Sequence, residues 1–156
     1  MKTDLRLDIR SDPGLLCACR GMVRAYFDRM GLERSRVDEI VLAVDESVTN
    51  AIRHSYEGRT DESVTVILSS DDNWIQCDIV DQGKAAPPER ITRKPPASPK
   101  KDDVQPGGLG VQLIYDVCDE AVFKPGEARG NRVTLRFRRP RDTSNPSKPP
   151  QAEGGQ

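Results

Sequence analysis

In the first thirty residues, the apolar positions first alternate as in a strand and then recur with the spacing of a helix. Apolar and polar side chains alternate from Thr3 to Ile9, which predicts a half-buried strand. Asp12 and a proline then open a segment in which apolar residues recur with helical spacing. Asp12 is therefore expected to cap a helix that ends near Gly31.

The strongest helical pattern lies between residues 35 and 52. Ser35 is a favourable N-cap residue, and acidic Asp38 and Glu39 follow in the expected first turn. The apolar residues with helical spacing are Val37, Ile40, Val41, Val44, Val48, Ala51 and Ile52. They form one stripe, which predicts that this helix packs on a sheet.

The rest of the chain contains short strand patterns and one further helix. Strand patterns occur at 64–68, 74–80, 122–123 and 133–137, and a helical pattern at 109–117. Residues 82–106 contain six prolines and no apolar period, so they predict a long loop of the kind that forms functional lids or is disordered. From residue 139 onward, proline, serine, glycine and charged residues predict a disordered tail.

The composition narrows the classes of function. The 24 lysines and arginines nearly balance the 25 acidic residues, giving a net charge of −1, which does not favour general nucleic-acid binding. A basic cluster runs from Arg136 to Arg141. It has two possible interpretations, a solvated strand end with its tail or an RNA-binding patch. The sequence contains no signal-peptide pattern and no stretch long enough to span a bilayer, so a cytoplasmic location without membrane contact is expected.

The four cysteines do not favour a metal site. Cys77 and Cys118 lie in apolar patterns and are predicted to be small core residues. Cys17 and Cys19 are two positions apart on a predicted helix, so they point to different sides, and the only histidine, His54, lies elsewhere. Free thiols suit a reducing cytosol.

Glu46 and Asn50 lie one helical turn apart in the 35–52 segment. Their shared face lies opposite the apolar stripe. One interpretation is an ordinary solvated face. The other is chemical: an amide oxygen is a hard ligand that suits magnesium, and a carboxylate one turn away can accept a proton from a nucleophile.

Two glycine-containing segments add further candidates. Asp81-Gln82-Gly83 follows a predicted strand and is either a common turn or a carboxylate that accepts the exocyclic amine of adenine, with Gly83 letting the base approach. Gly107-Gly108-Leu109-Gly110 leads directly into a helix, where exposed backbone amides and the helix dipole favour phosphate groups. The latter segment lacks the lysine of a P-loop.

The order and spacing of these segments resemble the GHKL ATPases, and especially the anti-sigma factor serine kinases. Residues 46–56, read as ESVTNAIRHSY, are similar to their N box; Asp81-Gln82-Gly83 resembles the first glycine box, and residues 107–114, GGLGVQLI, resemble the second. The 130–135 ending, GNRVTL, resembles the last strand, with Thr134 at the usual threonine. The resemblance covers roughly residues 4 to 138.

This resemblance implies a fold, cofactors and residue roles. The implied fold is a two-layer α/β sandwich of the Bergerat type, with helices on one face of a mixed, mainly antiparallel sheet. Residues 1–138 would form the ATPase domain, 84–107 its ATP lid, and 139–156 a tail. Glu46 would be the general base and Asn50 the Mg²⁺ ligand, while His54 is equally consistent with packing near the pocket. The ATP-binding residues implied are Asn50, Arg53, His54, Asp81, Gly83, Gly108, Leu109, Gly110, Val111 and Thr134.

The resemblance also implies partners and leaves alternatives. The first expectation is a kinase that phosphorylates an anti-sigma-factor antagonist and sequesters a sigma factor. A homodimer is expected by resemblance, because partners in this family bind a kinase dimer. The second is an ATP-gated binding module without phosphotransfer. The third, the ATPase half of a sensor histidine kinase, would require an upstream phospho-accepting histidine. The sequence departs from the pattern after Gly83, where Lys84-Ala85-Ala86-Pro87-Pro88 stands in place of a second glycine and a phenylalanine.

Overall fold

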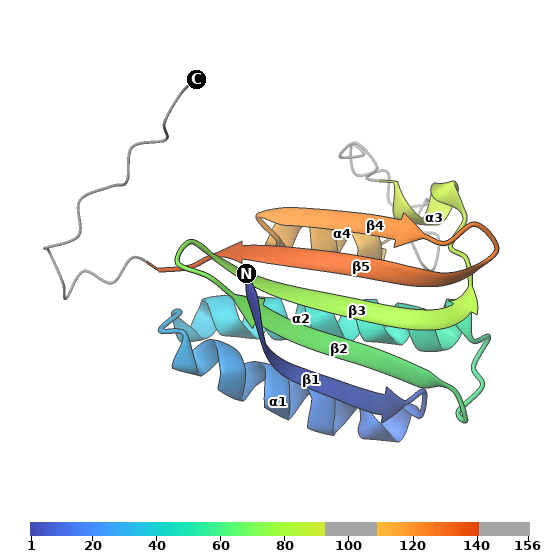
Figure 1. The fold of residues 1–156 in the computed structure, drawn as a ribbon, viewed down its shortest axis with the longest axis horizontal. Coiled ribbons are helices and arrows are strands. Elements are labelled where there is room, and N and C mark those ends of the chain that lie inside the picture. Colours follow the sequence, from blue (N-terminus) through green and yellow to red (C-terminus); the bar gives the residue numbers. More distant parts are fainter. Residues whose placement is uncertain (93–108, 141–156) are drawn as a thin grey trace, which may run out of the picture.

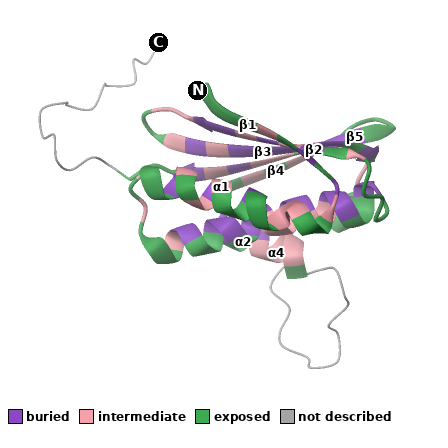
Figure 2. Ribbon diagram, turned by 90° about the horizontal axis from the view of Figure 1, so that it is seen from below, coloured by how far each residue is buried: buried purple, intermediate pink, exposed green. Residues whose placement is uncertain are grey.

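The chain folds into a sheet covered on one face by helices (Figures 1 and 2). The structure is a computed structural model that describes residues 1–92 and 109–140. The five strands, in the order β1-β2-β3-β5-β4, are β1 (Lys2–Arg10), β2 (Ser63–Ser70), β3 (Trp74–Lys84), β5 (Arg129–Arg138) and β4 (Glu120–Pro125). One layer of helices on one sheet confirms the expected two-layer fold. All four strand pairings of the described residues are antiparallel, where a mixed, mainly antiparallel sheet was expected.

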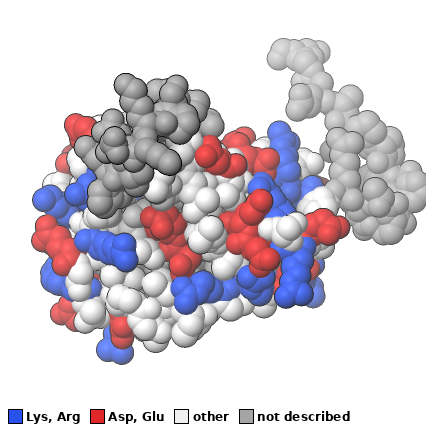
Figure 3. Space-filling model, turned by 180° about the vertical axis from the view of Figure 1, so that it is seen from behind, with Lys and Arg blue, Asp and Glu red and all other residues white. Residues whose placement is uncertain are grey.

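The helices lie on one face of the sheet, called here the inner face, or at its edge (Figures 1 and 2). They are η1 (Pro13–Leu15), α1 (Leu16–Arg29), α2 (Arg34–Asn50), η2 (Ala51–Ser55), α3 (Pro88–Ile91) and α4 (Leu109–Val117). The α2 helix lies between α1 and α4 and contacts both. In the described part, no helix combines the length and apolar character needed to cross a membrane. Acidic and basic side chains are intermixed on the helical face (Figure 3).

The core forms where the predicted apolar stripe of α2 meets the sheet. Val37, Ile40, Val44 and Val48 are at most 1 % exposed, as the helical period requires. The α1 helix joins this core through Phe27, whose ring meets Phe137 of β5 edge-to-face at 5.4 Å. Cys77 and Cys118 are buried core residues, as predicted.

The helix starts are only partly as predicted. The Asp12 side chain does accept a hydrogen bond from the Gly14 amide, at 2.8 Å, and so caps η1. Ser35, in contrast, is not the cap of α2, because the helix already begins at Arg34 and Glu33 is the N-cap residue. Asp38 and Glu39 consequently fall beyond the first turn.

The third strand is longer than its apolar pattern. Because β5 supplies partners as far as Arg129, β3 continues through Asp81 to Lys84, with an irregular register between these two residues. Asp81 therefore lies within a strand and not in the turn after it. The α3 helix also lies within the predicted loop, and residues 93–106 of that loop and 141–156 of the tail are outside the described residues.

In the part of the chain that the structure describes, no helix covers the outer face of the sheet, where charged side chains of β5 lie beside Trp74. Arg136 and Arg138 stack on the Trp74 ring, with their guanidinium carbons 4.2 and 4.0 Å from its centroid. Arg136 also forms an ion pair with Glu120. The described part of the basic cluster is thus engaged with neighbouring strands at this end of the sheet.

Candidate functional site

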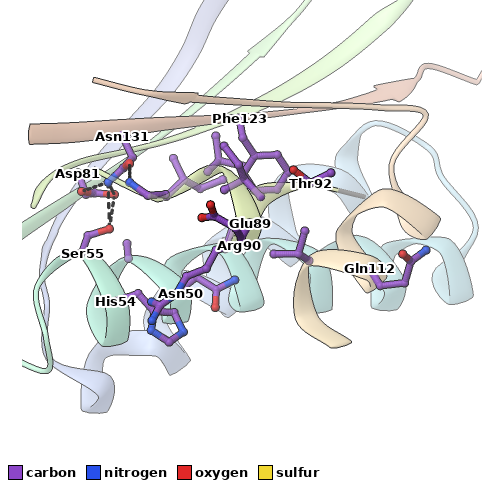
Figure 4. A pocket seen from close by; sticks show the side chains of 17 residues that line it. Asn50, His54, Ser55, Asp81, Glu89, Arg90, Thr92, Gln112, Phe123 and Asn131 are labelled. Atoms are coloured by element: carbon purple, nitrogen blue, oxygen red, sulfur yellow. Dashed lines mark hydrogen bonds between the residues drawn. The ribbon is translucent and has the colours of Figure 1, made fainter. Parts of the chain in front are cut away.

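A cavity of about 420 Å³ lies between the sheet, the end of α2 and α4. Its volume is in the range of small-molecule pockets. The helix side contributes Ser47, Asn50, Ala51, His54, Ser55, Val111 and Gln112; the sheet contributes Ile79, Asp81, Phe123, Asn131 and Val133; and the segment after β3 contributes Ala86, Glu89, Arg90, Ile91 and Thr92. Figure 4 shows Asp81, Ser55 and Asn131 at one end of the cavity and Gln112 at the other.

A change in helical winding positions the residues at the end of α2. The helix continues into the π-helical turn η2, in which the Tyr56 amide bonds to the Ala51 carbonyl at 3.0 Å. Such wide turns are frequent at functional sites. Here the turn brings Ser55 against Asp81, while Asn50 and His54 both line the cavity.

Asn50 and Glu46 occupy the flank of α2 that faces α4. Both are half-buried, and Ala43 and Ser47 on the same flank are buried. Glu46 and Asn50 are therefore not fully solvated, although Glu39 and Leu42 on the same side of α2 are exposed. Among the described residues no group bonds to the Asn50 side-chain amide, so its oxygen is available to a hard cation such as Mg²⁺.

Glu46 lies against the first turn of α4 and not on the cavity wall. A Cβ atom placed on Gly110 would lie 1.8 Å from Glu46 Oε1. Only glycine lets the start of α4 approach the carboxylate this closely. The structure thus brings Glu46, from the 46–56 motif, against Gly110, from the second glycine segment.

Asp81 is the centre of a buried hydrogen-bond cluster. Its Oδ1 accepts from the Gly83 amide and from Asn131 Nδ2, both at 2.9 Å. Its Oδ2 accepts from Ser55 Oγ and Asn131 Nδ2, both at 3.2 Å. Burial raises the pKa of the Asp81 carboxyl, while the donors from Asn131, Gly83 and Ser55 oppose this rise.

Asn131 is a site residue that the sequence interpretation missed. It is buried, follows Gly130 directly, and pairs in register with Asp81 across β3 and β5. Counting back by twos from the apolar Leu135 and Val133 places it on the inner face of the sheet. This alternation of strand residues is the sequence feature from which Asn131 could have been predicted.

The same alternation places Thr134 away from the cavity. Its hydroxyl donates to Asp78 Oδ1 at 2.5 Å, and it is not among the cavity-lining residues. Thr134 therefore does not face this cavity, and its implied role in ATP binding stays a prediction that this placement does not support. The reason is that neighbouring residues of a strand face opposite sides of the sheet, so Val133 and Thr134 cannot both face the cavity.

Gly83 has a structural role besides the one expected. A Cβ atom on Gly83 would lie 2.3 Å from the Ser55 carbonyl oxygen. Gly83 is buried and does not line the cavity. Its missing side chain lets β3 approach the η2 turn at Ser55, while the expected approach of a nucleotide base to Gly83 stays a prediction.

The start of α4 is only partly described. Gly107 and Gly108 lie outside the described residues, Leu109 is 69 % exposed, and Val111 lines the cavity. A helix start beside the cavity is compatible with a bound anion, since its amides and dipole favour negative charge.

Basic side chains surround the outer margin of the cavity. His54 and Arg90 line it, and Arg53 and Lys84 line a smaller adjoining cavity of about 190 Å³. Burial, followed by the charges of Arg90 and Arg53, lowers the pKa of the His54 imidazole. Arginine and lysine at this margin favour a negatively charged ligand.

The segment after β3 forms the front wall of the cavity. The Ala86 amide donates to Asn131 Oδ1 at 2.7 Å, and at the other end Tyr115 Oη of α4 donates to the Ile91 carbonyl at 2.8 Å. Two fixed elements thus hold residues 86–91 in place. Glu89 and Arg90 from this wall line the cavity (Figure 4).

Comparisons with known proteins agree with this geometry. The sequence profile described as histidine kinase-like ATPase domain matches residues 9–137. Among curated relatives, a protein named serine-protein kinase RsbW from Oceanobacillus iheyensis is 23 % identical, over 74 % of this chain and 75 % of its own length. Proteins named anti-sigma F factor from Clostridium botulinum and Geobacillus stearothermophilus are 25 % and 23 % identical, over 75 % and 87 % of this chain and 81 % and 92 % of theirs.

Solved structures support the fold. The RsbU and RsbW domains of a Mycobacterium tuberculosis protein match with a TM-score of 0.63 and 19 % identity, covering 90 % of this chain and 34 % of that chain, so the present chain spans about a third of it. The SiaB–SiaC complex from Pseudomonas aeruginosa matches with a TM-score of 0.63 and 15 % identity, covering 86 % of this chain and 89 % of that chain.

Proposed function

The chain belongs to the histidine kinase-like ATPase family, and on this premise we propose that it binds ATP with magnesium and phosphorylates a serine or threonine of a partner protein. The names of its relatives, anti-sigma F factor and serine-protein kinase, support a partner that antagonises an anti-sigma factor, and sequestration of a sigma factor. A homodimer acting in the cytoplasm is part of the proposal. So is the division into an ATPase domain at 1–138, a lid at 84–107 and a tail at 139–156.

The cavity supplies groups for each part of the nucleotide. Asp81, at one end, would accept the exocyclic amine of adenine. Asn50 would hold Mg²⁺, which neutralises phosphate charge when bound. The backbone amides of residues 108–111, which precede and begin α4 in the sequence, would receive the phosphates. Arg53 and His54, at the margin, would add positive charge or hydrogen bonds there.

The placement of Glu46 carries the proposal of phosphotransfer. It is a half-buried carboxylate one turn before Asn50 and against Gly110, where the helix start would receive the terminal phosphate. A carboxylate at this point can take the proton from an attacking hydroxyl. The hydroxyl would come from the partner protein, which would approach the solvent-exposed side of α2.

Magnesium-dependent binding is the first test. Replacing Asn50 by Ala should abolish the magnesium-dependent part of ATP binding, measured by isothermal titration with and without the metal. Thr49→Ala is the matched control, because Thr49 is the preceding residue of α2 and does not line the cavity. Undiminished magnesium-dependent affinity in Asn50→Ala would contradict the site.

Phosphotransfer needs a separate test. Glu46→Gln keeps the shape of the side chain against Gly110 but removes its basicity. Transfer of labelled phosphate to an antagonist encoded beside this gene should fall at least 100-fold, in the range typical of general bases, while ATP affinity is kept. Equal transfer by the variant would remove Glu46 from the mechanism.

The second candidate function is an ATP-gated binding module without phosphotransfer. One observation favours it: Glu46 does not line the cavity formed by the described residues. Under this function, ATP would change affinity for a partner, and no labelled phosphate would reach any co-expressed partner.

A further inference from the structure

Asn131 uses every polar atom of its side chain within the protein. Its Nδ2 lies within hydrogen-bonding distance of both oxygens of Asp81, of Ser55 Oγ at 3.0 Å and of the Lys84 carbonyl at 2.9 Å, so its two hydrogens are shared among these acceptors. Its Oδ1 accepts from the Ala86 amide at 2.7 Å. The Ala86 amide donates to the oxygen of the Asn131 side chain, and acceptors surround its nitrogen. A flip of the side-chain amide would therefore lose these bonds. Asn131 is therefore held in one orientation.

This orientation fixes the Asp81 carboxylate. An ionised carboxylate offers about four acceptor positions. The Gly83 amide, Asn131 and Ser55 make four contacts to its two oxygens, two to each, so a ligand amine would have to share or displace one of them. The two contacts to Oδ2 are the longer ones, at 3.2 Å, so a ligand amine is accommodated there most easily.

The same residue fixes the front wall. Ala86 leads through Pro87 into α3, and Glu89 of that helix lines the cavity. Asn131 thereby joins the Asp81 carboxylate and the wall at Ala86 in one set of contacts. Neither Asp81 nor Ala86 has another described side chain that bridges them.

We propose that Asn131 is the positioning residue that makes this cavity selective for a purine carrying an exocyclic amine, by holding Asp81 and the wall at Ala86 in one fixed relation. The inference rests on the proposed function, since it requires the nucleotide base to lie at Asp81. Asn131 acts through Asp81 and not on the reacting atoms.

The test compares two nucleotides in the full chain. ATP and purine riboside 5′-triphosphate differ only in the 6-amino group. The wild-type protein should bind ATP about tenfold or more tightly, as expected for one hydrogen bond to a charged acceptor. In Asn131→Leu, which is similar in size but cannot hydrogen-bond, ATP affinity should fall toward that of the analogue while analogue affinity changes little.

A second variant and a control separate this role from general destabilisation. Asn131→Ser keeps one donor and should give an intermediate ratio of the two affinities, even if Asn131→Leu folds poorly. Thr65→Val, at a residue of β2 that does not line the cavity, should keep the wild-type ratio. Hydrogen exchange at the Ala86 amide should become faster in both Asn131 variants, because its acceptor is lost.

The outcomes are distinguishable. Equal loss of affinity for both nucleotides, or an unchanged ratio, would overturn the positioning role while leaving ATP binding intact. A wild-type protein that binds neither nucleotide would overturn the proposed function, and this inference with it.

Discussion

The carboxylate of Glu46 occupies the space that a side chain at Gly110 would need. The clashing atoms belong to the end of a flexible side chain and not to the backbone: a Cβ on Gly110 would meet Oε1 at 1.8 Å and Cδ at 2.3 Å. A substitution at Gly110 is therefore expected to move Glu46 before it unfolds the domain.

The first prediction concerns this pair. Gly110→Ala should lower the free energy of unfolding by about 1–2 kcal/mol through overpacking. In a Glu46→Ala background the same change should cost almost nothing, because the clash is gone. Urea unfolding of the two single variants and the double variant measures the coupling. Additive effects would show that the two side chains do not compete for one space.

The core could be predicted from the sequence because its periods are unambiguous. The stripe that includes Val44 and Val48 has helical spacing, and the structure buries it. The pairing of Glu46 with Gly110 could not be predicted, because it depends on how α4 packs on α2. Separate motifs become one site only when the tertiary contact forms.

The strands show why single site residues were harder to predict. Thr134 and Asn131 are three positions apart on β5, so they face opposite sides of the sheet. The resemblance to the family's last strand pointed to the threonine as a site residue, whereas the alternation of strand residues places the asparagine on the cavity side. Asn131 matters through Asp81, fifty residues earlier in the chain, and local sequence carries no signal for that contact.

The second prediction concerns Gly83. Gly83→Ala would place a Cβ 2.3 Å from the Ser55 carbonyl oxygen, which is backbone and cannot easily move. The free energy of unfolding should fall by about 1–3 kcal/mol, measured by urea unfolding. Gly21→Ala in α1 is the matched control. It has no atom within 4 Å of the new Cβ and should be neutral or stabilising by up to about 1 kcal/mol. An equally mild effect at both glycines would contradict the close packing of β3 on η2.

The third prediction tests the face assigned to Thr134. Thr134→Val removes the hydrogen bond to the buried Asp78 carboxylate, so the free energy of unfolding should fall by about 1–3 kcal/mol. Affinity for ATP should stay within about twofold of the wild type, because the residue does not line the cavity. Titration calorimetry checks the affinity. A large loss of affinity with unchanged stability would place Thr134 back in the nucleotide site.

The fourth prediction concerns the pH dependence that Asp81 gives to stability. Its pKa is raised above the ordinary value of 3.8, chiefly by burial, so the folded chain keeps this proton to a higher pH than the unfolded chain does. Stability from this group is therefore greatest below 3.8 and is lost as the pH rises through the folded pKa. Asp81→Asn removes the titration. The unfolding free energy of the wild type minus that of Asp81→Asn should fall as the pH rises from about 4 toward neutrality. Urea unfolding at a series of pH values measures this difference, and its slope does not depend on any constant offset that the new amide introduces. A difference that rises with pH would mean that the donors from Asn131, Gly83 and Ser55 outweigh burial, so that the folded carboxylate would be stabilised in its ionised form.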